Sequence, residues 1–488
     1  MPNQENFTQI TPLGSVAGAV SRHLIEAPLA FHVPYEGANP HVLAAFPDGF
    51  FPSFGSGLAF KGEEGNGELA FYCLTDRGPN GDGPELPALG GSGTMGSKIF
   101  PAPGFTPSIG VLHAGAGGAR LVQCLPIRSA DGVHASGLPI PHGSAGNSAE
   151  IPVFDALRYD AAGKAIFHLG GIDSEAIAYD RKRQLLWITD EYGPFLVAID
   201  PHSGVMRQRY APGHGLPPVL ALRRANRGME GMTHDPSTDT IHAFLQSPLS
   251  DGSALYAATG AQEKVERFAR FTRWVEFDPA SGATLRMLAY PLDGKDYADG
   301  RTGNAKLGDL VALGGGKFVV IEQGEGADGK IFNKLMLVEI GAATDIGAVQ
   351  FNPDTSDLEK SSMSGASERG ASWDSVAPLS KSLLLDLNAL GWVAEKAEGL
   401  ALVDGNTLAM TNDNDFGMKT RVYDAAGDEL AHADVTGFEV DGGGAIIKGS
   451  APGTVVRVGQ GAPHERPLCL WLLRFATPLA HYKGDKNA

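Results

Sequence analysis

Cysteine is scarce in this chain of 488 residues. The three cysteines, Cys73, Cys124 and Cys469, lie far apart and form neither a CxxC pair nor a zinc-ligand spacing. Their odd number and wide separation argue against a disulfide framework of the kind that holds small secreted domains together. We therefore expect buried, apolar cysteines, with a single disulfide as the alternative.

Long apolar runs and basic residues are also scarce. No apolar stretch approaches the length of a membrane-spanning helix. The polar N-terminus does not form a signal peptide, so the sequence predicts a cytoplasmic protein, or a periplasmic or secreted one whose leader has been removed. The net charge of −17 would repel nucleic acid. The negative charge does not exclude a small phosphate ester as a ligand, because a bound cation would reverse the local electric field.

Several common catalytic motifs are missing as well. No GxSxG, Walker or HExxH motif occurs. Residues 91–96 match GxGxxG, but prolines flank them on both sides, whereas a dinucleotide site needs a strand before that motif and a helix after it. The sequence therefore gives no support to a dinucleotide site or to a serine hydrolase of the usual kind.

Turns, in contrast, are abundant. The 65 glycines and 32 prolines separate short apolar runs, which indicates strands rather than long helices. One unit recurs: it begins with a polar or small residue and an apolar pair, and a second apolar run ending in Asp, Glu or Gln follows about 15 residues later. The five copies begin at Gly55, Asp173, Met229, Gly308 and Ala397.

Each unit predicts a β-hairpin, in which the start of the first strand and the end of the second lie at the same edge. A propeller repeats such sheets around one axis, which would gather these starts and ends on one face. The sequence therefore predicts an all-β propeller of about six or seven blades. We expect a single domain over residues 20–478, with insertions near 78–117 and 345–377, the second with a short helix, and terminal segments 1–19 and 479–488.

Acidic residues at the hairpin starts and ends form a candidate metal site. The predicted metal ligands are Glu175, Glu230, Asp309, Glu322 and Glu398. Ca²⁺ takes about six to eight oxygen ligands and is the first expectation. Mn²⁺ or another transition metal is the alternative, if His214, His234 or His242 adds a nitrogen ligand. In the opposing interpretation the acids cap strands, bond to loop amides or face solvent.

Neighbouring residues supply candidates for catalysis and substrate binding. The predicted catalytic carboxylates are Asp76, Asp190 and Glu191, and the predicted substrate-binding cations are Arg77, Arg227 and Lys334. These cations lie beside acidic strand ends, where they would bind a phosphate or carboxylate or else form structural ion pairs. Residues 412–417 begin like a calcium loop but lack the distal Glu of an EF-hand, so an Asx-rich turn is the alternative.

Seven short stretches together resemble one known family: residues 75–81, 173–178, 190–194, 226–231, 246–249, 398–401 and 412–417. In these stretches, which run in the family's order over nearly the whole chain, the sequence resembles bacterial propeller proteins known for the esterase-like activity of phytase. Ala176 stands where the family pattern has Gly. The resemblance implies a propeller, a phosphoesterase-like activity and a divalent metal.

Three functions are consistent with these features. The first is a metal-dependent hydrolase of phosphate mono-, di- or triesters that uses metal-activated water. The second is a calcium-dependent carboxylesterase or lactonase, in which the metal polarises a carbonyl group and His or Asp is the general base. The third is a non-catalytic ligand-binding propeller with a structural metal. The expected partner of the two enzymes is a small-molecule ester.

Overall fold

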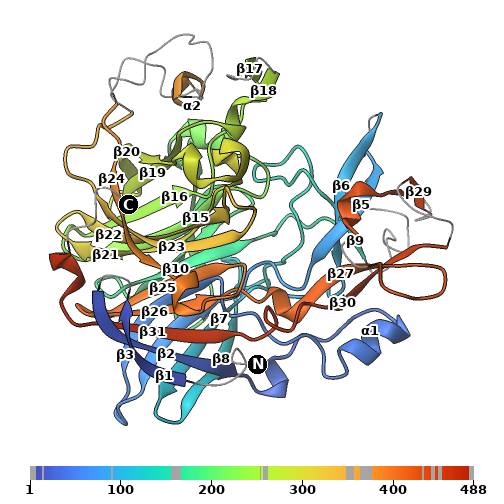
Figure 1. Cartoon of the computed structure of the whole chain (residues 1–488), viewed down its shortest axis with the longest axis horizontal. Helices are drawn as coiled ribbons and strands as arrows, with labels where there is room; N and C mark the ends of the chain where they lie inside the picture. The colour runs from blue at the N-terminus through green and yellow to red at the C-terminus, as the bar shows by residue number, and fades with distance from the viewer. Residues whose placement is uncertain are drawn as a thin grey trace.

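Strands that alternate with tight turns make up most of the protein in the computed structural model (Figure 1). The structure describes residues 7–13, 16–89, 92–154, 166–252, 254–256, 262–347, 357–362, 376–430, 433–440, 446–448 and 453–482. Within these ranges the α-helices are α1 (Pro40–Ala45) and α2 (Asp357–Ser362), each six residues long. The predicted all-β class is confirmed.

Groups of four antiparallel strands form the blades of a propeller. The first blade contains β3 (Gly57–Glu63), β4 (Leu69–Leu74), β7 (Ser108–Gly115) and β8 (Gly118–Pro126). The second contains β10 (Ser174–Asp180), β11 (Leu185–Asp190), β12 (Phe195–Ile199) and β13 (Met206–Pro212), with β14 (Gly215–Leu216) at its edge. The third contains β15 (Met229–Asp235), β16 (Thr240–Leu245), β19 (Phe271–Asp278) and β20 (Ala283–Pro291).

The fourth blade contains β21 (Lys306–Gly314), β22 (Lys317–Glu325), β23 (Ile331–Glu339) and β24 (Ser380–Asp386). The fifth contains β25 (Ala397–Asp404), β26 (Thr407–Asn412), β31 (Cys469–Phe475) and β2 (Val16–Glu26). Its outer strand β2 comes from the N-terminal region and pairs with β31 from the C-terminal region, and β1 (Phe7–Leu13) adds to β2. Strands from both ends of the chain therefore close the propeller.

The first strand of each blade lies innermost. Neighbouring innermost strands pack against one another in the closed order β3, β10, β15, β21, β25. They approach so closely that a Cβ atom on Gly57 would lie 2.8 Å from the Glu175 carbonyl oxygen, and one on Gly231 would lie 2.5 Å from the Gly308 carbonyl oxygen. Glycine is needed there because contacts this short leave no room for a side chain.

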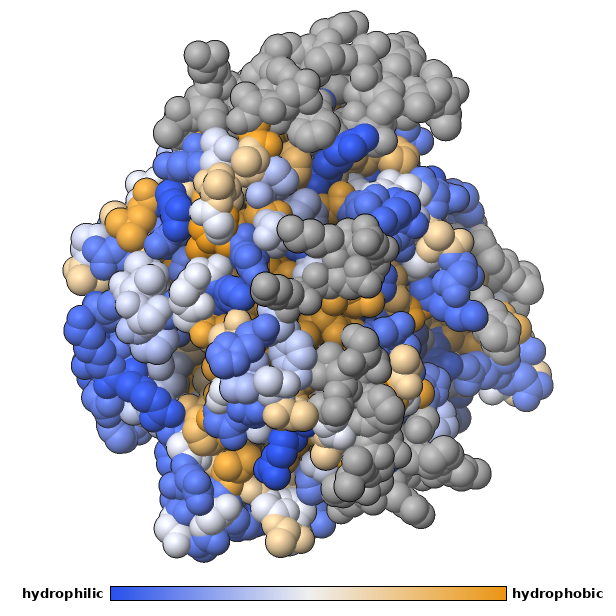
Figure 2. All heavy atoms as spheres, turned by 60° about the vertical axis from the view of Figure 1, so that its left-hand side comes forward, coloured by the Kyte–Doolittle hydropathy of each residue, from blue (hydrophilic) through white to orange (hydrophobic). Residues whose placement is uncertain are grey.

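The apolar core is divided into layers between successive blades. Trp187 belongs to the layer between the second and third blades, and Trp274 to that between the third and fourth. Similar layers lie between the fourth and fifth, the fifth and first, and the first and second blades. Figure 2 shows hydrophilic side chains over most of the visible surface, with hydrophobic ones mainly in recesses between them.

The expected number of about six or seven blades is wrong for the described part of the chain, which forms five. The remaining strand-rich segments build a separate layer beside the propeller, on the right in Figure 1, which we call the cap. Its elements are α1, β5 (Gly81–Pro87), β6 (Thr94–Phe100), β9 (Ile151–Phe154), β27 (Met418–Tyr423), β28 (Glu439–Val440), β29 (Ile446–Lys448) and β30 (Val455–Gln460). The cap has its own apolar cluster, which includes Phe50, Phe416 and Phe438.

Several smaller expectations are also settled. Cys73 and Cys469 are buried, Cys124 is half-buried, and all three are free thiols. The short helix expected near residues 345–377 is α2, whose Glu359 forms a fully buried ion pair with Arg273 of β19; the small hairpin of β17 (Ala254–Tyr256) and β18 (Gln262–Lys264) lies nearby in Figure 1. Among the described residues, no helix is long and apolar enough to cross a membrane.

Candidate functional site

A β-bulge interrupts the start of four of the inner strands. The pairing register shifts at this place in β10, β15, β21 and β25, so that two residues of the inner strand stand opposite one residue of its neighbour. The first bulge residue is Glu175 in β10, Glu230 in β15 and Glu398 in β25. Because the inner strands form a ring, the three bulges bring these glutamates together at one end of the propeller axis.

In β21 the acidic residue is displaced by one position. Gly308 takes the first place of the bulge and Asp309 the second. Since successive residues of a strand point in opposite directions, Asp309 does not join the glutamates. Its carboxylate instead accepts backbone N–H groups of Met232 (3.1 Å), Leu310 (2.8 Å) and Leu400 (3.3 Å) and is 2% exposed. It thereby ties β15, β21 and β25 together and stays out of the cavity described next.

A cavity of about 700 Å³ opens above the glutamates, between the propeller and the cap. Asp173, Glu175 and Glu191 each place a carboxylate oxygen within 4.8 Å of the other two. Burial and the charge of Glu230 raise the pKa of Glu175 well above its usual range. Burial also raises the pKa values of Glu191 and Glu398 to about 8, with Asp173 contributing at Glu191 and Asp413 at Glu398. Without a cation these carboxylates repel one another.

The donor set suits a hard cation. Glu230 is 4% exposed, and its Oε2 atom is buried with no hydrogen-bond partner among the described residues. A buried carboxylate oxygen without a partner is costly, which indicates that a cation belongs beside it. No histidine is among the described residues that line the cavity. The site therefore offers carboxylate oxygens, which fit Ca²⁺ and other oxygen-preferring divalent ions.

The three histidines considered as nitrogen ligands lie elsewhere. His242 is in the core, where its Nδ1 accepts the indole N–H of Trp274 at 3.1 Å and burial lowers its pKa to about 4. His214 stacks on Tyr210. His234 forms a second close group with Asp180 and Asp239, but the Arg183 guanidinium already bonds both carboxylates. A cation is thus already present in that group.

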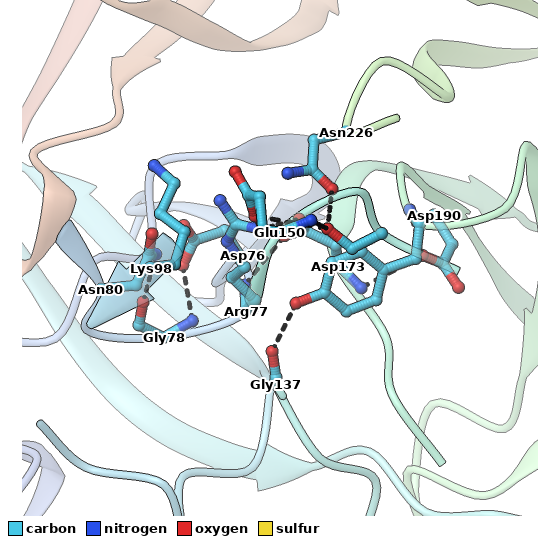
Figure 3. A network of polar contacts seen from close by, with 12 residues as sticks. Asp76, Arg77, Gly78, Asn80, Lys98, Gly137, Glu150, Asp173, Asp190 and Asn226 are labelled. Atoms are coloured by element: carbon cyan, nitrogen blue, oxygen red, sulfur yellow. Dashed lines mark hydrogen bonds and ion pairs between the residues drawn. The ribbon is translucent and has the colours of Figure 1, made fainter. Parts of the chain in front are cut away.

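Arg77 lies in the cavity wall. Its guanidinium faces Glu150 and Asp173, each at 3.4 Å (Figure 3). It also packs near the rings of Phe100 and Tyr192. Asp173 also accepts the backbone N–H of Arg77 at 3.2 Å. Asp173 stands in one of the family-like stretches, so the sequence offered a signal for it; Glu150 comes from the loop between β8 and the cap strand β9 and had none.

The predicted catalytic carboxylates separate into two groups. Asp76 and Glu191 line the cavity, but Asp190 does not. Asp190 is fully buried and accepts the N–H groups of Asp173 (3.1 Å) and Tyr192 (3.0 Å) as well as an Arg209 guanidinium N–H. Asp190 therefore supports the loop that presents Asp173 and Glu191, because adjacent residues at a strand end cannot both face the cavity.

Two further predicted residues lie outside the cavity. Glu322 accepts hydrogen bonds from the hydroxyl groups of Tyr290 (2.8 Å) and Tyr297 (2.9 Å), and it forms an ion pair with Lys381. Lys334 lies 3.8 Å from an Asp296 carboxylate oxygen. The structure does not bring either residue to the glutamates, because their side chains lie in the fourth blade and its loops, away from the axis.

The loop at residues 412–417 carries its own cation. The Lys396 ammonium donates to Asp413 at 2.6 Å and to Asp415 at 2.7 Å. Burial opposes this charge, but Asp413 and Asp415 raise the pKa of Lys396 well above its usual range. Asp413 also accepts the backbone N–H of Asp415 at 3.0 Å. This bond is that of an Asx turn, the alternative to a calcium loop at these residues. Lys396 lines the cavity and had no signal in the repeat pattern.

A family model described as phytase-like, with the esterase-like activity of phytase, matches residues 56–416. Among curated proteins, none matches the chain. The α-L-arabinofuranosidase PaAbf62A from Podospora anserina is 8% identical, with coverage of 93% of this chain and 97% of that chain and a TM-score of 0.33. The PQQ domain of pyranose dehydrogenase from Coprinopsis cinerea is 11% identical, with coverage of 75% and 92% and a TM-score of 0.31. At these scores the two structures carry no information on activity.

Proposed function

Since this chain belongs to the phytase-like family described by the esterase-like activity of phytase, we propose that it is a metal-dependent hydrolase of phosphate esters. The observation that carries the proposal is the buried Glu230 oxygen without a partner beside the close carboxylates of Asp173, Glu175 and Glu191. These four residues would hold a divalent cation, with Ca²⁺ as the first expectation. Such a cation would lower the pKa of a bound water and neutralise charge on a phosphoryl oxygen.

The chain's own groups supply the rest of the chemistry. Arg77 and Arg227 line the cavity and would bind and orient the anionic oxygens of a phosphate ester. Asp76 has one carboxylate oxygen fixed by the N–H of Gly78 at 2.8 Å. Burial and the charge of Asp413 raise the pKa of Asp76 well above its usual range. A carboxylate with a raised pKa is a stronger base than an ordinary one, which suits Asp76 for taking the proton of the attacking water.

Ester hydrolysis with and without metal tests the proposal. Turnover of p-nitrophenyl phosphate, bis-p-nitrophenyl phosphate and p-nitrophenyl acetate is measured after EDTA treatment and after addition of Ca²⁺ or Mn²⁺. We expect phosphate-ester hydrolysis that EDTA abolishes and metal restores. Hydrolysis of the acetate alone would identify a carboxylesterase, and metal binding without turnover of any ester would identify a ligand-binding propeller.

A matched pair of variants locates the metal. Glu230→Gln removes a charge inside the cavity, whereas Glu322→Gln removes one from the tyrosine-bonded position outside it. Elemental analysis should show less bound metal in the first variant and an unchanged content in the second. Equal metal content in both would remove Glu230 from the set of ligands.

A further inference from the structure

A second cavity lies on the propeller axis, on the side away from the glutamates. The inner strands begin at the end of the axis where the glutamates lie, and this cavity is lined by residues farther along the same five strands. Its volume is about 480 Å³, and among the described residues its lining shares none with the first cavity. Small-molecule sites have volumes of about 300–1,000 Å³. We call this second cavity the axial pocket.

Two rings of residues, one residue from each inner strand, form the wall of the axial pocket. The first ring is buried and consists of Leu58, Ile177, Met232, Leu310 and Leu400. The second ring lies two residues farther along each strand, is half-buried and consists of Phe60, Tyr179, His234, Ala312 and Leu402. Residues two apart in a strand point to the same side. Apolar side chains therefore make up nearly all of both rings.

Asp309 closes the inner end of the axial pocket. Its carboxylate accepts the N–H groups of three first-ring residues, Met232, Leu310 and Leu400. The N–H of Leu58 is a fourth donor to the same carboxylate. Donors on four of the five inner strands reach one carboxylate only if it lies inside the ring that these strands form. Asp309 belongs to the lining of neither cavity, so it separates the axial pocket from the glutamates.

The outer end of the axial pocket carries an exposed arginine, Arg181. Its guanidinium lies 5.0 Å from the centre of the Tyr179 ring and donates to the Phe60 carbonyl oxygen at 2.8 Å. Both of these contacts are with second-ring residues, so the guanidinium lies at the mouth. Among the described residues, no carboxylate lies within ion-pair distance of it. A guanidinium has five N–H donors, so most of those of Arg181 are left for a ligand.

The other charged groups at the mouth neutralise one another. Of the charged residues that line the pocket, Arg181 and Lys182 are basic and Asp239 is acidic. The Asp239 carboxylate already accepts Lys182 at 2.5 Å and Arg183 at 2.7 Å, and His234 lies 3.2 Å from it. The mouth therefore keeps one positive charge, that of Arg181, in a chain whose net charge is −17.

We propose that the axial pocket binds an amphiphilic carboxylate, of which a medium-chain fatty acid is the simplest form. The hydrocarbon chain would lie between the two rings, where its removal from water supplies most of the affinity. The carboxylate would lie at the mouth and accept N–H groups of the Arg181 guanidinium. Asp309 keeps such a ligand away from the first cavity. The inference therefore does not depend on the proposed hydrolase activity.

Isothermal titration of the EDTA-treated protein with hexanoate, octanoate and decanoate tests the pocket. Without metal, the carboxylates of the first cavity repel these anions. Each buried methylene group should lower the Kd about fourfold, so each step of two carbons should lower it about 15-fold while the chain still fits. The uncharged 1-octanol should bind more weakly than octanoate. Absence of decanoate binding, or a Kd that is independent of chain length, would overturn the proposal, as would equal affinity for 1-octanol and octanoate.

Two variants locate the ligand. Arg181→Gln should raise the Kd of octanoate about fivefold, as for loss of an ion pair at an exposed position, and leave that of 1-octanol unchanged. The control is Arg207→Gln, because Arg207 is an exposed arginine that pairs with Asp200 outside the pocket, and it should change neither Kd. Ala312→Met enlarges the smallest side chain of the second ring, so it should weaken decanoate more than hexanoate. Octanoate binding that neither variant weakens would contradict the proposed site.

Thermal unfolding and sedimentation complete the test. Octanoate should raise the Tm of the wild type more than that of Arg181→Gln, whereas the two proteins should have similar Tm values without ligand. A wild type that octanoate does not stabilise would count against the pocket. The other candidate occupant of the mouth is a second copy of the chain. A dimer in sedimentation velocity that octanoate or Arg181→Gln dissociates would assign the mouth to that copy and overturn the proposal.

Discussion

Replacing Glu191 by Gln tests the electrostatics of the cavity, because the change removes a charge and almost no volume. Burial and Asp173 raise the pKa of Glu191 from 4.5 to about 8. Between these values the folded, metal-free protein keeps a proton that the unfolded chain has released, so its stability falls as the pH rises through this window. At about 1.4 kcal/mol per pH unit, the rise from pH 4.5 to pH 7 gives an upper limit of about 3 kcal/mol.

We therefore expect metal-free Glu191→Gln to be more stable than the wild type at pH 7, by up to about 3 kcal/mol, and nearly equal to it at pH 4.5. Urea unfolding in EDTA between pH 4.5 and pH 8 measures this difference. The matched control is Glu325→Gln at the exposed end of β22, which should show no gain at any pH.

Added metal should make the wild type more stable than Glu191→Gln. A ligand at 100 times its Kd stabilises the folded state by about 2.7 kcal/mol, and the wild type should gain more than the variant, because Gln is the weaker ligand. A metal-free variant that is no more stable than the wild type at pH 7, with the same dependence on pH, would show that the buried carboxylates do not repel one another as argued.

Three other predictions follow from the placement of single residues. Glu398→Gln removes a negative charge that acts on Glu175 and Glu230, so it should weaken metal binding and phosphate-ester hydrolysis together, as measured by elemental analysis and p-nitrophenyl phosphate turnover; a loss of neither would place Glu398 outside the site. Asp309→Asn should leave metal content unchanged but lower the free energy of unfolding by about 2–3 kcal/mol in urea, because backbone N–H groups of three strands lose acceptors; unaltered stability would contradict that role. Arg77→Ala should raise the KM for p-nitrophenyl phosphate about tenfold, whereas Lys334→Ala should leave KM and kcat unchanged, and equal effects would refute the placement of the two cations.

Part of the site could be predicted from the position of each acidic residue within its repeat. Glu175, Glu230 and Glu398 share one place in the repeat, each followed by Ala or Gly. Asp309 follows Gly308 and is therefore shifted by one residue, which turns its side chain away because the period of a strand is two. Strict alignment of the repeats would have excluded Asp309 as a ligand. The same alternation at the end of β11 separates Asp190 from Glu191.

Other members of the site had no local signal. Lys396 precedes its repeat by one residue, and Glu150 lies in a loop before a cap strand. Arg227, in contrast, stands beside an acidic strand start, which is the signal that predicted it as a substrate-binding cation. The groups of the site meet across the axis, between segments that are far apart in the chain, so no spacing along the sequence encodes their contact.

Short strands, tight turns and acidic residues at the hairpin starts could be predicted from the sequence, because they depend on side-chain alternation and local backbone geometry. The tertiary structure decided that the described strands form five blades, that β2 closes the ring against β31, and that the other strands form a cap. It also decided which carboxylates share a cavity. Ring closure and the cap depend on contacts between distant segments, and those contacts set how close like charges come and how much water they lose.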